Sequence, residues 1–164
     1  MATPVDRARA CEILGYDFVD ESILTEALRS AHRIEFGNGT YQSLENNRRL
    51  AAVGQAVINL QLTERWINGL EPLCTTARAY PYQTLIVTGK LADAQVQSAS
   101  NLALSTITMQ SGINSCIIES DRQRDLTVLP QSTLATALKA VIGAVWRDSH
   151  GNNEIVRRVL CRLQ

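Results

Sequence analysis

Residues 47–57, with the sequence NRRLAAVGQAV, form the most informative stretch of this chain. Its apolar side chains recur at intervals of three and four residues, a spacing that predicts an α-helix with one apolar face. Ala51 and Gln55 are four residues apart, so they lie one turn apart on a different face of this helix. The residues predicted to form the apolar face are Leu50, Val53, Val57 and Leu60.

A second stretch, residues 134–148, reads LATALKAVIGAVWRD and predicts a strongly apolar helix. Thr136 and Lys139 are three residues apart, so they share one face of that helix. Local signals predict further helices, because Gly15 is a natural helix end and Asp20 a natural helix start. The predicted helices cover residues 5–14, 21–28, 47–66, 91–111, 132–147 and 154–163, and residues 32–47 are predicted as a loop.

Both stretches resemble the ribonuclease III family. Its signature helix runs NERLEFLGDAV, and a second block of the family runs LADAFEALIGAIYLD; the glycines of these blocks are retained as Gly54 and Gly143. The order of the blocks holds from about residue 14 to 148, and residues 152–163 are expected to form a terminal helix. The resemblance therefore implies an all-α fold with a single ribonuclease III-like domain over residues 1–164, without an appended duplex-RNA-binding domain. Smaller matches lie at residues 14–18, 23–28, 89–91, 101–103 and 112–113.

The resemblance also implies where a metal site would lie. The four carboxylates with which the family binds magnesium map onto Ala51, Gln55, Thr136 and Lys139. Magnesium prefers carboxylate and water oxygens, and here a methyl, an amide, a hydroxyl and an ammonium stand in their place. We therefore expect no metal, no cofactor and no metal-dependent ribonuclease activity.

The family works as a two-fold dimer, in which an aromatic residue of the signature helix inserts into the partner. Ala52 stands at that position here and removes the plug. Symmetric dimers are the commonest soluble oligomers, so a homodimer is still expected.

Charge and composition bear on the remaining functions. Sixteen basic residues balance sixteen acidic ones over 164 residues, so any RNA contact must come from a local patch. Aromatic residues make up 5% of the chain and apolar residues 45%, a balance typical of packed helices. The candidate contacts to double-stranded RNA are Arg29, Arg33, Arg48, Arg49, Arg157 and Arg158.

The cysteines and the termini indicate the compartment. Cys11, Cys74, Cys116 and Cys161 are widely spaced, which argues against a zinc site and favours buried small apolar residues. No apolar run approaches the roughly 20 residues that span a bilayer, and the N-terminus lacks the features of a secretion signal. We expect an intracellular protein without membrane association.

Two functional hypotheses follow. In the first, the chain is a ribonuclease III-like pseudonuclease that acts as a dimeric structural or interaction module, either without RNA or by holding double-stranded RNA without cleaving it. In the second, the vacated cleft binds or turns over a small anionic or carbonyl-containing molecule. A desolvated lysine can act there as base, anion anchor or nucleophile. The residues of this candidate pocket are Asn47, Gln55, Thr136 and Lys139.

Overall fold

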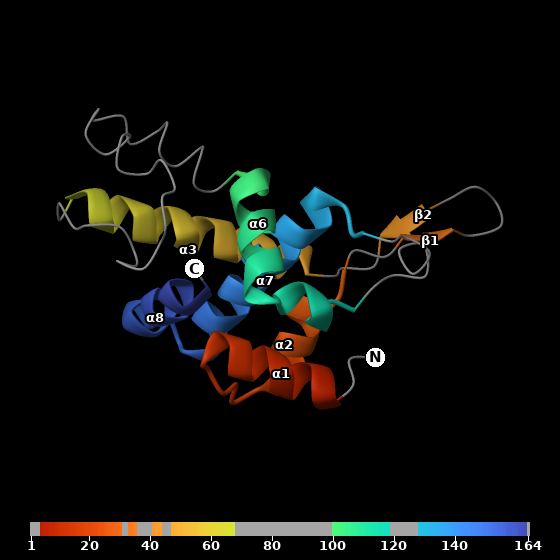
Figure 1. Ribbon diagram of the computed structural model, residues 1–164, viewed down its shortest axis with the longest axis horizontal. Coiled ribbons are helices and arrows are strands. Elements are labelled where there is room, and N and C mark those ends of the chain that lie inside the picture. The colour runs from red at the N-terminus through yellow and green to blue at the C-terminus, as the bar shows by residue number, and fades with distance from the viewer. Residues whose placement is uncertain are drawn as a thin grey trace.

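The computed structural model describes residues 4–30, 33–35, 41–43, 47–67, 100–118 and 128–163 (Figure 1). Most of these residues are helical, and the predicted all-α class is confirmed. Within the described residues, no helix combines the length and the hydropathy that crossing a membrane requires. The elements are α1 (Pro4–Leu14), α2 (Glu21–Leu28), β1 (Arg33–Glu35), β2 (Tyr41–Ser43), α3 (Arg48–Ile67), α6 (Asn101–Ser111), the 3-10 helix η1 (Ile113–Cys116), α7 (Gln131–Asp148) and α8 (Asn153–Leu163).

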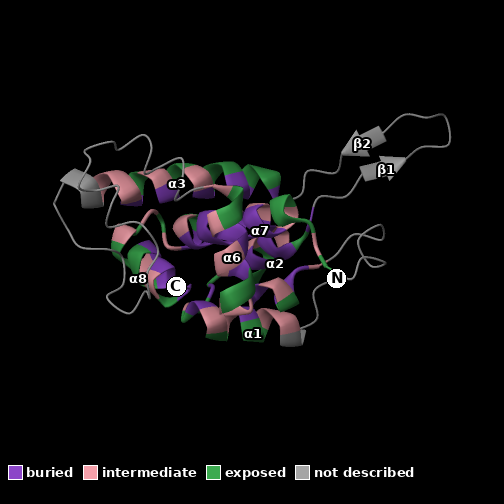
Figure 2. Ribbon diagram, turned by 45° about the horizontal axis from the view of Figure 1, so that its top comes forward, coloured by how far each residue is buried: buried purple, intermediate pink, exposed green. Residues whose placement is uncertain are grey.

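Helix α7 forms the centre of the core. Helices α2, α3, α6 and α8 all pack against it, and every residue from Ala140 to Val145 is buried. Figure 2 shows α7 as the most continuously buried helix, with α1 and α3 exposing one side to solvent. A helix that is apolar around most of its circumference is stable only when neighbours cover it on all sides, which explains its central place.

The helix ends follow the local signals in the sequence. The carboxylate of Asp20 accepts a hydrogen bond from the backbone N–H of Ser22 at 2.9 Å and so caps α2. Gly15 has a φ of +60° directly after α1, and Gly112 has a φ of +81° directly after α6. Both glycines adopt the left-handed conformation that ends a helix at little cost. The predicted ends at Leu14 and Ser111 are confirmed.

Helix α6 begins at Asn101, where Ser100 caps it through a 3.2 Å hydrogen bond from the backbone N–H of Ala103. The prediction of a helix from residue 91 is therefore confirmed for its second half, while residues 91–99 lie outside the described residues. The loop predicted over residues 32–47 contains a short hairpin instead. Strands β1 and β2 pair antiparallel with Ile34 opposite Gln42. Two strands of three residues leave the fold class unchanged.

The inward face of α3 differs from the predicted one. Leu50 and Val57 are buried, whereas Val53 and Leu60 are 41% and 40% exposed. The buried side of the helix is centred on Gly54, because this is where α3 touches α7. Spacing alone identified the apolar residues correctly, but the glycine determines which of them face the core.

Helix α8 is hydrogen-bonded to both α3 and α1. The side-chain amide of Asn153 accepts a hydrogen bond from Gln61 at 2.9 Å and donates one to Glu64 at 2.8 Å. At its other end, the Arg162 guanidinium donates to the carbonyl oxygens of Glu12 and Ile13, the last turn of α1, at 3.0 and 3.1 Å. These contacts place the start of α8 beside the second half of α3.

Cys11, Cys116 and Cys161 form no disulfide bond, and the prediction of buried cysteines is confirmed for Cys116. Cys116, the last residue of η1, is buried, and Cys11 and Cys161 are partly buried. Burial raises the pKa of the Cys11 and Cys116 thiols, which keeps both protonated and unreactive. Cys74 lies outside the described residues.

Candidate functional site

Two glycines bring α3 and α7 into backbone contact. A Cβ atom on Gly54 would lie 1.7 Å from the carbonyl oxygen of Lys139, and one on Gly143 would lie 2.1 Å from the carbonyl oxygen of Leu50. The two helices therefore run antiparallel, with Leu50 beside Gly143 and Gly54 beside Lys139. No other residue type allows such an approach, so these glycines fix how the two helices that carry Ala51, Gln55, Thr136 and Lys139 lie against each other.

The polar side chains at three of these four positions bond within their own helix or to a neighbour outside the set. Gln55 Nε2 donates to Asn59 Oδ1 at 3.1 Å, one turn further along α3. Thr136 Oγ1 donates to the carbonyl oxygen of Ser132 at 2.7 Å, one turn earlier in α7. Ala51 is buried and contributes only a methyl group. The crossing brings the two helices together without joining these side chains to one another.

Lys139 reaches a third helix. Its Nζ donates to Oδ1 of Asn101 at 3.1 Å, at the first residue of α6. The side chain is half-buried, and burial lowers the pKa of its ammonium below the ordinary value. No sequence pattern predicts this partner, because residues 101 and 139 meet only through the packing of α6 on α7.

Asn47 lies at the start of α3 and faces α2. It is 1% exposed, and its Nδ2 donates to the carbonyl oxygen of Ala27 at 3.2 Å. Seven residues separate it from Gly54, which corresponds to about 10 Å along a helix. The structure therefore does not bring Asn47 to Lys139 but uses it to hold the end of α2 against the start of α3.

The candidate RNA-binding arginines fall into two groups. Arg48 and Arg49 are exposed in the first turn of α3, and Arg29 is exposed directly after α2. The bond between Asn47 and Ala27 joins these two helix ends, so the three arginines belong to one end of the molecule. Arg33 lies in β1, and its side chain lies outside the described residues.

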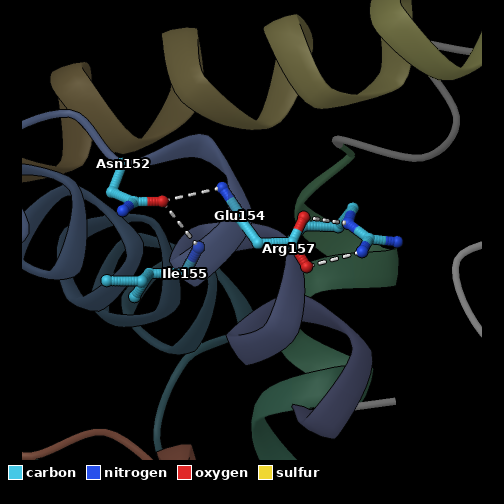
Figure 3. A network of polar contacts seen from close by, with 4 residues as sticks. All are labelled: Asn152, Glu154, Ile155 and Arg157. Atoms are coloured by element: carbon cyan, nitrogen blue, oxygen red, sulfur yellow. Dashed lines mark hydrogen bonds and ion pairs between the residues drawn. The ribbon is translucent and has the colours of Figure 1, made fainter.

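The second group lies on α8. Arg157 makes a two-pronged ion pair with Glu154, with N–O distances of 3.0 and 2.6 Å (Figure 3). Arg158 is exposed. Because α8 starts beside Gln61, thirteen residues after Arg48, the two groups are separated by about 20 Å along α3. The charge of Arg157 is largely neutralised within its own helix.

Asp148 is the buried carboxylate of the described residues, and it serves the fold rather than a metal. Its two oxygens accept hydrogen bonds from the hydroxyl of Tyr16 at 2.7 Å and from the backbone N–H groups of Val19 and Asp20, each at 3.0 Å. Within the described residues, no group of three or more histidine, cysteine or acidic side chains could hold a metal ion. Asp148 is nine residues from Lys139, about 13 Å along α7.

The fold and this helix pair define a ribonuclease III-like domain. The sequence pattern of the Ribonuclease III domain matches residues 48–150, which is more than half of the chain, so the chain belongs to this family. The match includes both α3 and α7 and therefore the glycine contact between them.

Particular relatives agree with this assignment. The chain is 29% identical to Ribonuclease 3 of Rhodopirellula baltica over 149 residues, which are 91% of this chain and 48% of that protein. The chain thus spans about half the length of this curated relative.

Solved structures show the same fold. The crystal structure of the nuclease domain of ribonuclease III from Campylobacter jejuni matches with a TM-score of 0.68 and 22% identity, over 99% of this chain and 94% of that one. A second structure of that domain, which concerns flexibility in a region involved in dimer formation, matches with a TM-score of 0.67 and 24% identity, over 94% and 92% of the two chains.

Proposed function

We propose that this chain is a ribonuclease III-like module that binds double-stranded RNA without cleaving it. The observation that carries the proposal is the contact between α3 and α7. The glycines that bring the two helices together are kept, while the four family carboxylate positions beside that contact hold Ala51, Gln55, Thr136 and Lys139. The framework of the family is therefore combined with side chains that cannot perform its metal chemistry.

Magnesium does not fit this set of residues. It binds oxygen ligands in octahedral geometry and requires negative charge to offset its own. A methyl group offers no ligand, and the ammonium of Lys139 adds positive charge where a cation would have to sit. At ~4 Å and an effective dielectric constant of ~20, that repulsion amounts to about 4 kcal/mol per unit charge.

Local charge supports an RNA-binding role, although the whole chain is neutral. The first acidic residue of α3 is Glu64, α7 has none before Asp148, and α6 has none. The neighbouring ends of α2 and α3 meanwhile carry Arg29, Arg48 and Arg49. Duplex RNA is recognised mostly through its phosphates, its 2′-hydroxyls and its shape, for which a locally basic surface is suited.

Reversing the charge of Arg48 and Arg49 tests this function. We expect Arg48→Glu with Arg49→Glu to weaken binding to a duplex RNA by about a hundredfold at 0.1 M salt, because two phosphate contacts are lost. Acidic residues favour a helix N-terminus, so the variant should still fold. A gel shift measured at several salt concentrations gives the affinity.

The matched control is the other arginine pair, Arg157→Glu with Arg158→Glu. It should cost much less affinity, because the Arg157 guanidinium is already paired with Glu154. The same RNA incubated with millimolar Mg²⁺ should remain intact. Magnesium-dependent cleavage by the purified protein, or an absence of RNA binding, would refute the proposed function.

The exposed face of α3 supports a homodimer as the assembled form. Val53 and Leu60 are 41% and 40% exposed, and Ala52 and Ala56 are exposed on the same side. A two-fold axis that sets two α3 helices antiparallel near Ala56 would bring Val53 of one copy to Leu60 of the other. The small alanines allow the helices to approach without an aromatic plug.

We therefore expect Leu60→Glu to weaken self-association at least tenfold, because it places a carboxylate against Val53 of the partner in an apolar contact without a counter-charge. Light scattering coupled to size-exclusion chromatography measures the mass across a dilution series. Leu102→Glu, at a 68% exposed position of α6, is the matched control and should leave the mass unchanged. A wild-type protein that is monomeric at high concentration would exclude this dimer.

The contacts of the candidate pocket residues give the small-molecule alternative little support. Asn47, Gln55 and Thr136 bond to Ala27, Asn59 and Ser132, so their polar atoms do not converge on Lys139. Lys139 is the charged member of that set, and its ammonium has two donors beyond the one that bonds Asn101.

A further inference from the structure

Lys139 carries a positive charge that no described acidic side chain neutralises. Its recorded hydrogen bond is to the neutral amide of Asn101, and an ammonium has three donors. Burial alone accounts for the lowered pKa of the ammonium, with no carboxylate contributing. A half-buried cation without a counter-charge is unfavourable, and an anion bound beside it would relieve that cost.

The side chain of Asn101 adds a second donor at the same place. Its Oδ1 accepts from Lys139, and its Nδ2 group belongs to the same amide and so lies near the ammonium; within the described residues this group donates no hydrogen bond. An ammonium and an amide N–H group side by side suit an oxyanion, which accepts from both. This pair links α7 with α6, two elements whose relative position the core fixes.

Lys139 also extends the basic end of the molecule. Its backbone touches Gly54, six residues after Arg48, which is about 9 Å along α3. Phosphates follow one another at about 3.4 Å of helix axis along one strand, so a nucleic-acid backbone can span that separation. Between Arg48 and Gly54 the helix has no acidic residue.

We infer that Lys139 and Asn101 form an oxyanion site that holds a backbone phosphate of the bound RNA duplex. The inference rests on the proposed RNA-binding function and assigns one phosphate contact within it. The lysine supplies a single fixed charge that binds the phosphate but cannot ionise a water molecule as a metal ion does. The site therefore contributes affinity without hydrolysis.

The salt dependence of RNA binding tests the site. Loss of one phosphate contact in Lys139→Gln should reduce the slope of log affinity against log salt by about 1 and the affinity at 0.1 M salt by about eightfold. Lys139→Arg keeps the charge and should retain the slope. Arg147→Gln removes an equal charge from the last turn of the same helix and should leave the slope unchanged.

The outcomes separate the site from the function. RNA binding with an unchanged slope in Lys139→Gln overturns the phosphate site and leaves the proposed function standing, whereas a wild-type protein that binds no duplex overturns both. Inorganic phosphate is the second probe, read as a shift in melting temperature. A phosphate-dependent rise that needs Lys139, together with an unchanged RNA slope, would assign the site to a free small anion and overturn the contact with RNA.

Discussion

Gly54→Ala is expected to lower the free energy of unfolding by about 3–5 kcal/mol. The new Cβ would lie 1.7 Å from the carbonyl oxygen of Lys139, a backbone atom that cannot rotate aside, so α3 and α7 would have to separate. Helix propensity alone predicts the opposite sign, because alanine is favoured over glycine in a helix interior by about 1 kcal/mol. Urea denaturation followed by circular dichroism measures the change.

Two further variants show whether the contact between α3 and α7 causes the destabilisation expected for Gly54→Ala. Ala8→Gly, at an exposed position of α1, isolates the propensity effect and should cost only about 1 kcal/mol. Gly143→Ala places its Cβ 2.1 Å from Leu50 at the same crossing. Once one variant has moved the helices apart, the second should cost less, so the double variant should fall clearly short of additivity. A stabilised Gly54→Ala protein would contradict the observed contact.

Much of the helical framework was predictable from short-range patterns. Gly15, Asp20 and Gly112 act on their immediate neighbours, so the ends of α1, α2 and α6 could be predicted from the sequence. The inward face of α3 could not be predicted from apolar spacing. Val53 and Leu60 are as apolar as Leu50 and Val57, and only the backbone contact at Gly54 decides between them.

In the candidate site, too, some features could be predicted from the sequence and others could not. The four positions that lack the family's carboxylates could be identified from the sequence, because the two family motifs align with this chain residue by residue. The partner of Lys139 did not, since Asn101 is 38 residues away and the packing of α6 brings it close. The sequence alone could not separate the arginines either, because the pairing of Arg157 with Glu154 and the bond between Asn47 and Ala27 are properties of the folded chain.

Asp148 is the second position at which a single substitution should have a large effect. The family block that resembles residues 134–148 also ends in an aspartate, but the resemblance does not explain the role of Asp148. In the structure its carboxylate holds the segment between α1 and α2 against the end of α7, through the hydroxyl of Tyr16 and the backbone N–H groups of Val19 and Asp20. Asp148→Asn replaces one acceptor oxygen by a donor that would face other donors, and we expect a loss of about 2–4 kcal/mol at pH 7.

The loss of stability caused by Asp148→Asn should depend on pH, and the pKa of the carboxyl predicts the direction of that dependence. Burial by itself would raise the pKa of the Asp148 carboxyl, but the hydrogen bonds from Tyr16, Asp20 and Val19 outweigh burial and hold that pKa below its ordinary value. A carboxyl whose pKa is lowered by folding stabilises the native state above its unfolded pKa of about 4, and this contribution is lost as the pH falls through the lower folded value. The stability gap between wild type and Asp148→Asn should therefore narrow below about pH 4.

At alkaline pH, the stability of the wild-type protein should fall as the pH rises, whereas at acidic pH the contribution of Asp148 grows with pH. Burial, and then the hydrogen bond to Asp148, raise the pKa of the Tyr16 hydroxyl well above its ordinary value. Above about pH 10 the unfolded chain releases this proton while the native state retains it, so wild-type stability should fall there. Asp148→Asn should reduce this alkaline loss in part, because burial of Tyr16 remains when the carboxylate charge is removed.

A neighbouring residue provides the control. Asp20→Asn makes the same chemical change one contact away, but asparagine caps a helix about as well as aspartate, so stability at pH 7 should change by only a few tenths of a kcal/mol. Free energies of unfolding from urea titrations between pH 3 and about pH 11 would compare the three proteins. Equal losses in the two variants, or a gap for Asp148→Asn that stays constant down to pH 3, would show that the ionised carboxylate does not hold these segments together.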